Sequence, residues 1–468
     1  MSPMAIKRYN RPMQITKSDY MLYLKHPAWL WLKKNDKDKL PPVDETTQAI
    51  FDTGHRFEPY VESLFPEGIT IAWEKDDWES YRTLPERTLQ ALDSGAPVIF
   101  QGRFEWQEFT FLPDIITQVS DKLLDLYEIK SSTSVNDSHI YDLAFQTVVL
   151  ESLGYTVRNV SVIHVNNQYV RHGAIDVSEL TICADVTEKV REQIDFTKDS
   201  MAQALATAKS KTMPDPSFDF LNTKLATKAD WQAVYDNIVE YAKVMPSGPP
   251  TIDKVAIGRF INSFRYPLYF LDYETMMGLI PYFDGQRPYQ QVPFQYSLHV
   301  LDSPDAELRQ TEYLHSENSD PVKPLCEKLI QDCGEVGTII SWNKGFEMRC
   351  NTEMGVLYPE FAEALESINS RIVDLGEPFK PANGWYSDPR FEGSWSIKKV
   401  LPIVVPDLSY KDLDIGDGGT AQRLWMEAVL DETRAKEKDK ILADLRKYCG
   451  LDTLAMVEIF HALRKVLE

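Results

Sequence analysis

The sequence predicts an α/β protein with two domains, and three observations support this prediction. The chain has 468 residues, more than one hydrophobic core usually organises. In both halves, short apolar or alternating segments typical of strands are interspersed with longer segments of helical periodicity. The stretch MPSGPP at residues 245–250 interrupts this pattern and indicates a linker. We therefore expect a first domain in residues 1–212, a helical connector and linker in 213–250, and a second domain in 251–468.

The composition is that of a well-packed globular protein, with 43% hydrophobic and 11% aromatic residues. No apolar run approaches the ~18 residues of a membrane span, and the N-terminus lacks the apolar core of a signal peptide. We expect a cytoplasmic protein that does not associate with a membrane. The five cysteines are odd in number and form no CxxC pair, which favours reduced core thiols over a disulfide framework or a zinc site.

The formal net charge of −21 bears on the choice of partner. The acidic excess is shared about evenly by the two halves, so neither half has the basic surface of a typical nucleic-acid-binding domain. A nuclease would instead need a local basic groove. The candidate residues for such a groove are Lys33, Lys34, Lys37, Lys39, Lys398, Lys399 and residues 434–440. They are interleaved with acids, so an ordinary charged surface is the favoured interpretation of each.

Two amphipathic helices are expected near the N-terminus. The first covers residues 15–34, with Ser18 as its N-cap. The second lies within residues 51–68 and places Phe57, Val61 and Leu64 on one side. Further along, we expect a helix from residue 137, a hairpin at 157–173 and a return to helix over 178–209.

The next segment carries the first candidate site. Alternating residues predict strands at 98–108, 109–118 and 123–130, with a turn at 120–122. Glu128 and Lys130 would share a face of the last strand, and Asp114 would come from the strand paired with it. The two acids would hold a divalent metal, and the lysine would activate water or stabilise the charge of a phosphate.

This PD…ExK phrase resembles the PD-(D/E)XK nucleases of the RecB type. The resemblance implies that Gln146 belongs to a Q-x-x-x-Y motif, although position 150 is Leu rather than Tyr. It also implies an acidic residue or histidine on the first helix. Glu58 is the preferred third ligand and His55 the alternative, and both also fit an ordinary surface. Because no cysteine precedes Cys183, the iron–sulfur cluster of some RecB-type nucleases is not expected.

The second candidate site begins at the phrase FLDYET. Residues 269–274 read as a buried strand, so Asp272 and Glu274 would leave it on the same face. Burying two like charges is costly unless a cation offsets them, which suggests a divalent metal; the alternative is a solvated strand end. Residues 443–463 have helical periodicity, so Tyr448 and Asp452, four positions apart, would share a helix face.

A strand DxE followed by a helical YxxxD resembles the DEDD exonucleases, the DnaQ-like branch of the ribonuclease-H-like fold. The apolar strand at 338–342 and the residues after it resemble the N-x-x-F-D motif of that family, with Glu347 at the usual aspartate position. The resemblance implies two metal ions bridged by Asp272 and completed by Glu274 and Asp452. Tyr448 would orient the water, and cleavage would run from 3′ to 5′.

A third resemblance extends over residues 252–467. Five segments resemble, in the same order, those of bacterial domain-of-unknown-function family 2779. These segments are YPLYFLDYET, RPYQQVPFQYSLHV, SWNKGFE, GSWSIKKVLPIVVPDLSYKDL and YCGLDTLAMV. This family implies no established reaction. Asp374, beside another short apolar run, is expected to support structure or to contact substrate rather than to bind metal.

The sequence therefore predicts a PD-(D/E)XK restriction-endonuclease-like domain followed by a ribonuclease-H-like domain. The expected activity is hydrolysis of phosphodiester bonds in DNA or RNA with Mg²⁺ or Mn²⁺. One alternative is a non-catalytic nucleic-acid-binding or assembly protein built on degenerate nuclease folds, which the departures at Leu150 and Glu347 favour. Another is a metal-dependent phosphohydrolase for small nucleotides, which suits the acidic surface.

Overall fold

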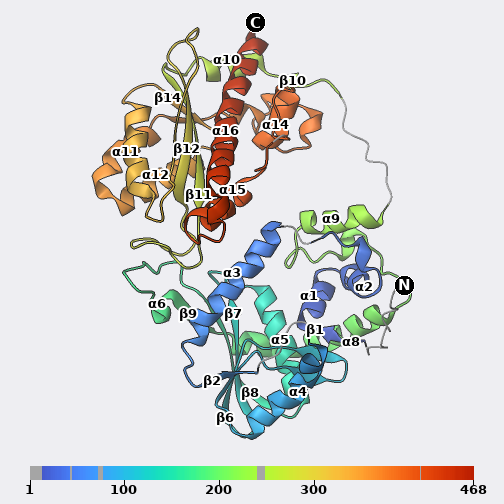
Figure 1. Ribbon diagram of the computed structural model, residues 1–468. Coiled ribbons are helices and arrows are strands. Elements are labelled where there is room, and N and C mark those ends of the chain that lie inside the picture. Colours follow the sequence, from blue (N-terminus) through green and yellow to red (C-terminus); the bar gives the residue numbers. More distant parts are fainter. Residues whose placement is uncertain (1–12, 43–44, 72–76, 240–247, 412) are drawn as a thin grey trace, which may run out of the picture. The chain divides into compact units, whose positions relative to one another are not determined.

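The computed structural model describes residues 13–42, 45–71, 77–239, 248–411 and 413–468. The chain divides into two compact units (Figure 1). The N-terminal unit comprises residues 1–169 and 174–242, and the C-terminal unit comprises residues 170–173 and 243–468. The division at 242–243 falls within the predicted connector. Residues 245–247 of the predicted linker lie outside the described residues, whereas 248–250 are described.

The N-terminal unit combines a large sheet with helices on its faces. Its strands are β1 (Ile15–Thr16), β2 (Gly68–Thr70), β3 (Val98–Phe100), β4 (Phe104–Trp106), β5 (Phe109–Phe111), β6 (Ile115–Ser120), β7 (Leu123–Lys130), β8 (Thr156–Val165) and β9 (Thr181–Asp185). Its helices are α1 (Lys17–Lys25), α2 (Pro27–Asn35), α3 (Glu45–Glu62), α4 (Trp78–Asp93), α5 (Asp137–Ser152), α6 (Val177–Leu180), α7 (Thr187–Glu192), α8 (Ile194–Lys209) and α9 (Lys228–Ile238), with 3₁₀ turns at Lys37–Lys39 and Phe218–Phe220.

Six strands form the main sheet of this unit, in the order β2-β3-β6-β7-β8-β9. β6 and β7 form the predicted antiparallel hairpin, and β7 also pairs in parallel with β8. The apolar face of the sheet packs against α5, whose Leu143, Ala144 and Phe145 are fully buried. The strand that carries Glu128 and Lys130 is thus an interior strand, fixed on both sides.

Several predicted boundaries in this unit are wrong, for local reasons. The predicted helix at 15–34 is instead β1 followed by two helices, because Pro27 starts a new helix that His26 caps. Thr16, not Ser18, caps α1: its side chain accepts from the Asp19 amide in a capping box. Leu64 lies beyond the end of α3 and is exposed, whereas Phe57 and Val61 are buried as predicted.

The predicted strands at 98–108 and 109–118 are each divided in two. Gln101 has a positive φ of 54°, which ends β3, and Pro113 separates β5 from β6. The predicted hairpin at 157–173 is also wrong, since β8 pairs with β9, which lies within the segment predicted as helix. Period-two patterns identified the segments of β3 to β8 but missed β9, because the partner of β8 depends on contacts that no local pattern encodes.

The C-terminal unit contains a second sheet. Its strands are β10 (Thr251–Ile252), β11 (Leu268–Met276), β12 (Val292–Leu301), β13 (Arg309–Leu314), β14 (Thr338–Ser341), β15 (Ile372–Asp374) and β16 (Tyr386–Ser387). Its helices are α10 (Lys254–Ile261), α11 (Val322–Cys333), α12 (Gly345–Leu357), α13 (Ala362–Asn369), α14 (Ile397–Val404), α15 (Gly418–Val429) and α16 (Lys438–Leu467), with 3₁₀ turns at Pro359–Phe361, Glu377–Phe379, Pro389–Phe391 and Ala435–Glu437.

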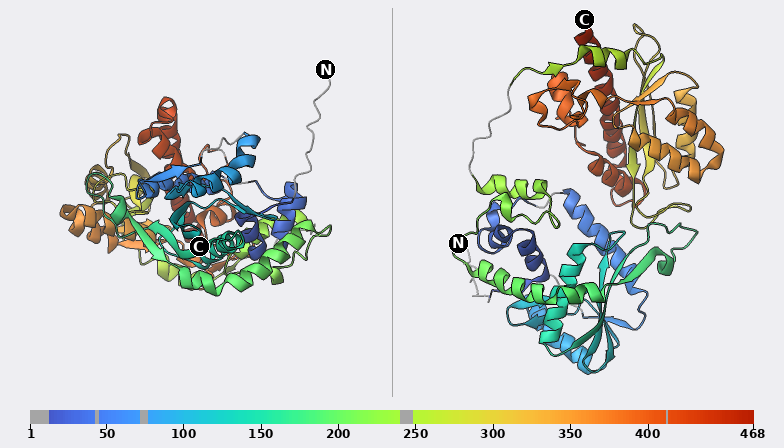
Figure 2. Two further views of the ribbon diagram at one scale, coloured as in Figure 1. Left: turned by 90° about the horizontal axis from the view of Figure 1, so that it is seen from below. Right: turned by 180° about the vertical axis from the view of Figure 1, so that it is seen from behind.

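The five-stranded sheet has the order β13-β12-β11-β14-β15, with β11 in the centre. β11 is antiparallel to β12 and parallel to β14, and these two parallel strands correspond to the predicted strands at 269–274 and 338–342. Helices α11 and α12 lie on one side of the sheet and α16 on the other (Figures 1 and 2). Both faces of the central strand are therefore covered, which explains why its sequence is almost continuously apolar.

Four of the five cysteines are buried, in agreement with the predicted core thiols, whereas Cys183 on β9 is exposed. That prediction is wrong for Cys183 because β9 is the edge strand of its sheet. Among the helices of the described residues, none combines the length and the apolar character needed to cross a bilayer.

Candidate metal centres

The C-terminal centre starts from Asp272 and Glu274 on β11. In the register of the sheet, Asp272 lies opposite Ser297 of β12 and Glu274 lies opposite Gln295. Being two residues apart on one strand, the two carboxylates leave it on the same face, as predicted. Glu274 is only 6% exposed. An apolar central strand therefore carries two acids into a nearly buried position.

Helix α16 brings a phenol and a third acid to the same place. It packs against β11 and β12, and its Tyr448 and Asp452 are both buried. The hydroxyl of Tyr410, from the loop after α14, donates to Oδ1 of Asp452 at 2.6 Å. Asp452 is thus held by Tyr410, and Tyr448 also contributes a side-chain hydrogen bond to it.

Helix α12 supplies the fourth acid, Glu347, from its first turn. The turn before the helix is made by Asn343, whose φ of 69° is left-handed, a conformation that Asn adopts more readily than most residues. The Glu347 side chain is 1% exposed, and its Oε2 has no hydrogen-bond partner among the described residues. A buried carboxylate oxygen without a partner is costly unless a cation or proton satisfies it.

The four acids influence one another. Burial and the charges of Asp452, Glu274 and Glu347 raise the pKa of Asp272 well above its ordinary value. Burial and the charge of Asp452 do the same for Glu274. Burial raises the pKa of Glu347 to about 8 and that of Asp452 to about 6. Such mutual repulsion is what a bound divalent cation would relieve.

The donor set fits a divalent metal. One carboxylate oxygen each from Asp272 and Glu274, together with Sγ of Cys449, lie within 4.8 Å of one another. Sγ of Cys449 also lies 3.8 Å from the main-chain oxygen of Asp272. Carboxylate oxygens are the ligands that Mg²⁺ and Mn²⁺ prefer. Asp272 and Glu274 supply the oxygen donors of this group, and Asp452 of α16 lies near enough for its charge to raise the pKa of both.

Asp374 has a different role in the same unit. Its Oδ1 accepts from the amides of Asn343 and Gly376, at 3.0 and 2.9 Å, and its Oδ2 accepts from Lys380 at 2.7 Å. These bonds occupy both oxygens and fix the turn that leads into α12. Asp374 therefore positions Glu347 from a distance.

The N-terminal centre is built on the β6–β7 hairpin. Asp114 immediately precedes β6, and its Oδ2 accepts from the amide of Ile129 at 2.7 Å. Glu128 is 2% exposed and accepts from Lys130 Nζ at 2.8 Å. Gln146 of α5 donates to the other oxygen of Glu128 at 2.8 Å. The PD…ExK residues and Gln146 are thus brought together.

Two further residues enter this centre, Lys17 and Asp142. Lys17, the first residue of α1, donates to Oε1 of Glu128 at 2.6 Å. Asp142 of α5 accepts from Lys130 at 3.2 Å and from Gln146 at 3.0 Å. Glu128 therefore has two ammonium groups and an amide as partners.

The pKa values reflect this arrangement. Burial and the charge of Glu128 raise the pKa of Asp114 to about 7. Although burial opposes ionisation of Glu128, the charges of Lys130 and Lys17 hold its pKa well below the ordinary value. In the N-terminal centre two ammonium groups thus pair directly with Glu128.

The predicted third ligand, Glu58, has other partners. Its Oε1 lies 3.2 Å from Nδ1 of His55, the alternative candidate, and its Oε2 accepts from Gln101 at 3.5 Å. Within the part of the chain that the structure describes, no hydrogen bond or ion pair joins Glu58 to Asp114 or Glu128. Leu150, at the position of the motif tyrosine, is fully buried in the core.

Some residues of the two centres escape detection in the sequence. Asp142 precedes Gln146 by four positions on one helix, and that spacing is a usable signal. Lys17 is 111 residues from Glu128, and Tyr410 is 42 from Asp452. No local pattern links residues so far apart.

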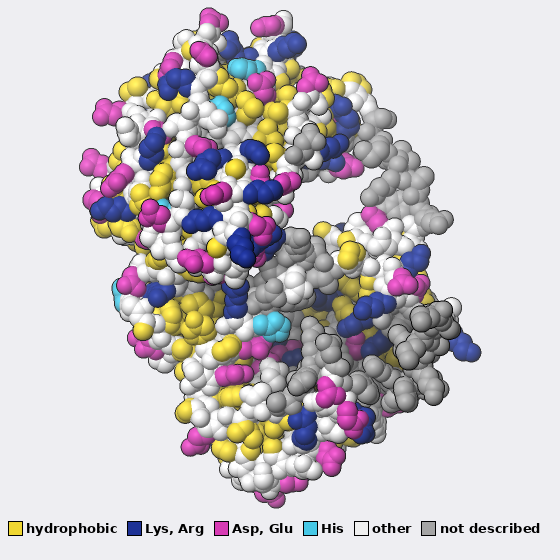
Figure 3. Space-filling view, in the orientation of Figure 1, with side chains coloured by type: hydrophobic (Ala, Val, Ile, Leu, Met, Phe, Trp, Pro, Cys, Tyr) yellow, Lys and Arg dark blue, Asp and Glu magenta, His cyan; other side chains and the backbone are white. Residues whose placement is uncertain are grey.

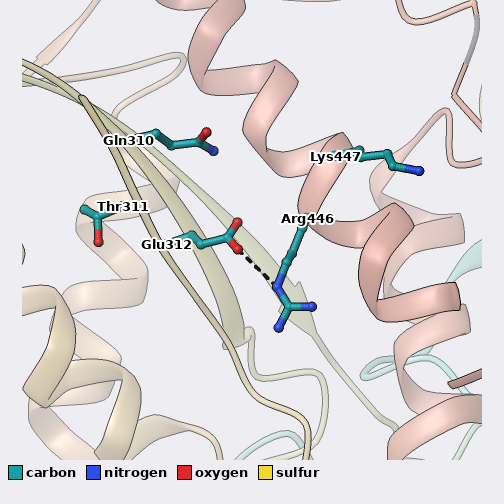
Figure 4. Close-up of a pocket in the computed structure, with 5 residues that line it drawn as sticks. All are labelled: Gln310, Thr311, Glu312, Arg446 and Lys447. Atoms are coloured by element: carbon teal, nitrogen blue, oxygen red, sulfur yellow. Dashed lines mark ion pairs between the residues drawn. The ribbon is translucent and has the colours of Figure 1, made fainter. Parts of the chain in front are cut away.

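Several of the basic candidates are paired with acids. Lys33 and Lys34 pair with the buried Asp19, Lys399 pairs with Glu392, and Lys440 pairs with Asp414 and Asp444. On the face in Figure 3, dark-blue cations are scattered among magenta acids. A surface depression at β13 and α16 is lined by Gln310, Thr311, Glu312, Arg446 and Lys447, and Glu312 pairs with Arg446 (Figure 4). It offers no metal-binding cluster.

Comparison with known proteins supports a family assignment for part of the chain. The chain is 27% identical over 226 residues to "Uncharacterized protein MG366" of Mycoplasma genitalium, a match that covers 44% of the chain and 33% of the relative. It is 24% identical over 237 residues to "Uncharacterized protein UU173" of Ureaplasma parvum, covering 46% and 34%. The chain thus matches about a third of the length of these curated relatives. Residues 269–396 contain a DUF2779 domain, described as a domain of unknown function, which begins on the strand that carries Asp272 and Glu274.

Proposed function

We propose that this protein is a divalent-metal-dependent nuclease whose C-terminal unit is a 3′–5′ exonuclease of the ribonuclease-H-like, DEDD type. One observation carries the proposal. Four carboxylates from three separate elements meet in a nearly buried cluster, and one of their oxygens has no partner among the described residues. A stable fold retains such a cluster at a cost, which points to a cation that binds there.

The reaction would be hydrolysis of a phosphodiester. The oxygen of a water molecule forms a bond to phosphorus, the bond from phosphorus to the leaving sugar oxygen breaks, and one proton of the water ends on that oxygen. Bound Mg²⁺ or Mn²⁺ supplies Lewis-acid activation of the water and offsets the charge of the phosphate. Asp272, Glu274 and Asp452 would hold the metal, and Tyr448 would orient the water.

The N-terminal unit is proposed as a second nuclease centre of the PD-(D/E)XK type. Asp114 and Glu128 would hold its metal, and Lys130 would face the phosphate. Lys17 and Lys130 already balance part of the charge of Glu128. This favours the alternative for the N-terminal unit, a non-catalytic nucleic-acid-binding scaffold. The test must therefore separate the two centres.

The experiment is digestion of end-labelled single- and double-stranded DNA and RNA with Mg²⁺ or Mn²⁺. Asp272→Asn should reduce exonucleolytic cleavage by about a hundredfold or more, because it removes a shared metal ligand. Glu128→Gln should remove the remaining activity if the N-terminal unit also cleaves. Asp305→Asn changes an exposed acid in the β12–β13 loop and is the matched control.

A double variant, D272N with E128Q, decides the proposal. If it cleaves as fast as the unaltered protein, neither cluster is an active site. If only D272N matters, the N-terminal unit is a scaffold.

A further inference from the structure

A lysine stands at the rim of the C-terminal carboxylate cluster. Lys398 is the second residue of α14, which lies beside α16 (Figure 1). Its Nζ donates to the main-chain oxygen of Gly416 at 2.7 Å and to the hydroxyl of Tyr448 at 3.0 Å. It lies 5.7 Å from the ring centre of Tyr410 and 5.2 Å from that of Tyr448. Two phenols and a carbonyl thus fix the ammonium group.

The bond to Tyr448 determines the direction of a proton. An ammonium group can only donate, so the Tyr448 oxygen must accept from it. The Tyr448 hydroxyl proton then points away from Lys398, and Asp452 is an acceptor for it, since a side-chain hydrogen bond from Tyr448 lowers the pKa of Asp452. A hydroxyl without such a partner would rotate freely. Lys398 therefore makes Tyr448 a directed donor.

The charge of Lys398 also reaches the acids. Tyr410, whose ring lies 5.7 Å from the ammonium group, donates to Asp452 at 2.6 Å, and Tyr448, which accepts from Lys398, lies one helical turn before Asp452. A fixed cation near three carboxylates weakens their attraction for a second cation. Metal affinity and the orientation of Tyr448 are therefore linked through one side chain.

We propose that Lys398 is a positioning residue of the C-terminal centre, which directs the hydroxyl of Tyr448 and limits the affinity of the carboxylates for metal. The proposal rests on the proposed metal-dependent nuclease function. Tyr410 assists, because it fixes Asp452 by a hydrogen bond and presents its ring to the same ammonium group.

The test compares adjacent lysines. Lys398→Met removes the charge and the donor but keeps an apolar side chain of similar length. Lys399→Met is the matched control, since Lys399 is the next residue of the same helix and pairs with Glu392. Both are made in the full chain with E128Q, so that the N-terminal centre does not contribute. Lys398→Arg, which keeps the charge and donates only, tests for rescue.

Two measurements are made on each protein: calorimetric titration with Mn²⁺, and single-turnover cleavage of end-labelled single-stranded DNA. We expect K398M to bind Mn²⁺ about threefold to tenfold more tightly, a modest gain because Lys398 is exposed to solvent. Its cleavage step should nevertheless be about tenfold slower or more, with little change in the DNA concentration that gives half the maximal rate. K399M should match the parent protein in both.

If Lys398 had a merely structural role, K398M would weaken both metal binding and cleavage. Tighter metal binding together with slower cleavage would not follow from such a role. If K398M matches K399M while the parent binds metal and cleaves, the proposal for Lys398 is overturned and the nuclease function stands. If the parent binds no Mn²⁺, both fall. Should K398M fail to fold, Lys398→Leu also removes the charge and the donor and gives the same comparison.

Discussion

Glu128 and Glu347 show how differently two buried glutamates are stabilised in this protein. Glu128 accepts from Lys17, Lys130 and Gln146, and these partners keep it ionised. Glu347 has one oxygen without any partner among the described residues, and burial raises its pKa to about 8. A cation added to the solution should therefore affect the C-terminal centre more than the N-terminal one.

Lys17 allows a test of this contrast at the N-terminal centre. In a protein carrying D272N, Lys17→Met should make binding of Mn²⁺ to Asp114 and Glu128 several-fold tighter, because an ammonium group 2.6 Å from Glu128 no longer competes with the metal. Calorimetric titration measures this. Lys198→Met, which removes an exposed lysine of α8, is the control. Equal affinities for the two variants would show that Lys17 does not control this centre.

The elements that carry the candidate residues were largely predictable. β7 has a period-two pattern, β11 and β14 are short apolar runs, and α5 and α16 have the length and composition of helices; the structure places these elements where the sequence indicates. Pairs two apart on a strand or four apart on a helix follow from such elements directly. What the patterns could not predict is which distant elements meet, as with Lys17 and β7 or Tyr410 and α16. The misplaced partner of β8 has the same cause.

One element-level prediction concerns the close approach of β14 to the start of β11. Gly337, which precedes β14, has a φ of 97°, and a Cβ there would lie 2.2 Å from the main-chain oxygen of Pro267. Gly337→Ala should therefore lower the free energy of unfolding by about 2 kcal/mol or more. Urea unfolding followed by circular dichroism measures the change.

Gly345→Ala is the matched control for this variant. Gly345 begins α12, and a Cβ there meets nothing within 4 Å. The substitution should leave stability unchanged or raise it by up to about 1 kcal/mol. If both variants unfold at the same urea concentration, the close contact at Gly337 is not important for stability.

At the scale of the whole molecule, each unit has its own buried core and its own cluster of acids. The core of the N-terminal unit joins its sheet to α5 and α8, and that of the C-terminal unit joins its sheet to α11, α15 and α16. With a net charge of −21, the chain gains little from general attraction to nucleic acid. Its affinity for a phosphodiester would depend on bound metal and on a few local cations such as Lys398 and Lys130.

The acid clusters also predict how stability depends on pH. The pKa values of Asp272 and Glu274 are raised well above normal, that of Asp452 to about 6 and that of Glu347 to about 8. Between about pH 4 and pH 8, the folded C-terminal unit therefore holds more protons than the unfolded chain. Its stability without metal should fall as the pH rises through this window, since deprotonation then favours the unfolded state.

Thermal unfolding in EDTA and in Mn²⁺, from pH 5 to pH 8, tests this prediction. In EDTA the melting temperature should decrease toward pH 8. Mn²⁺ should oppose this decrease, because it binds the ionised carboxylates and its binding releases protons.

Glu347→Gln removes the acid with a pKa of about 8, so the melting temperature of this variant in EDTA should fall less between pH 7 and pH 8. Asp305→Asn, an exposed acid in the same unit, should behave like the unaltered protein. If E347Q and the unaltered protein show the same decrease in EDTA, ionisation of Glu347 does not destabilise the folded unit. The protein alone then offsets the charge of the carboxylate cluster.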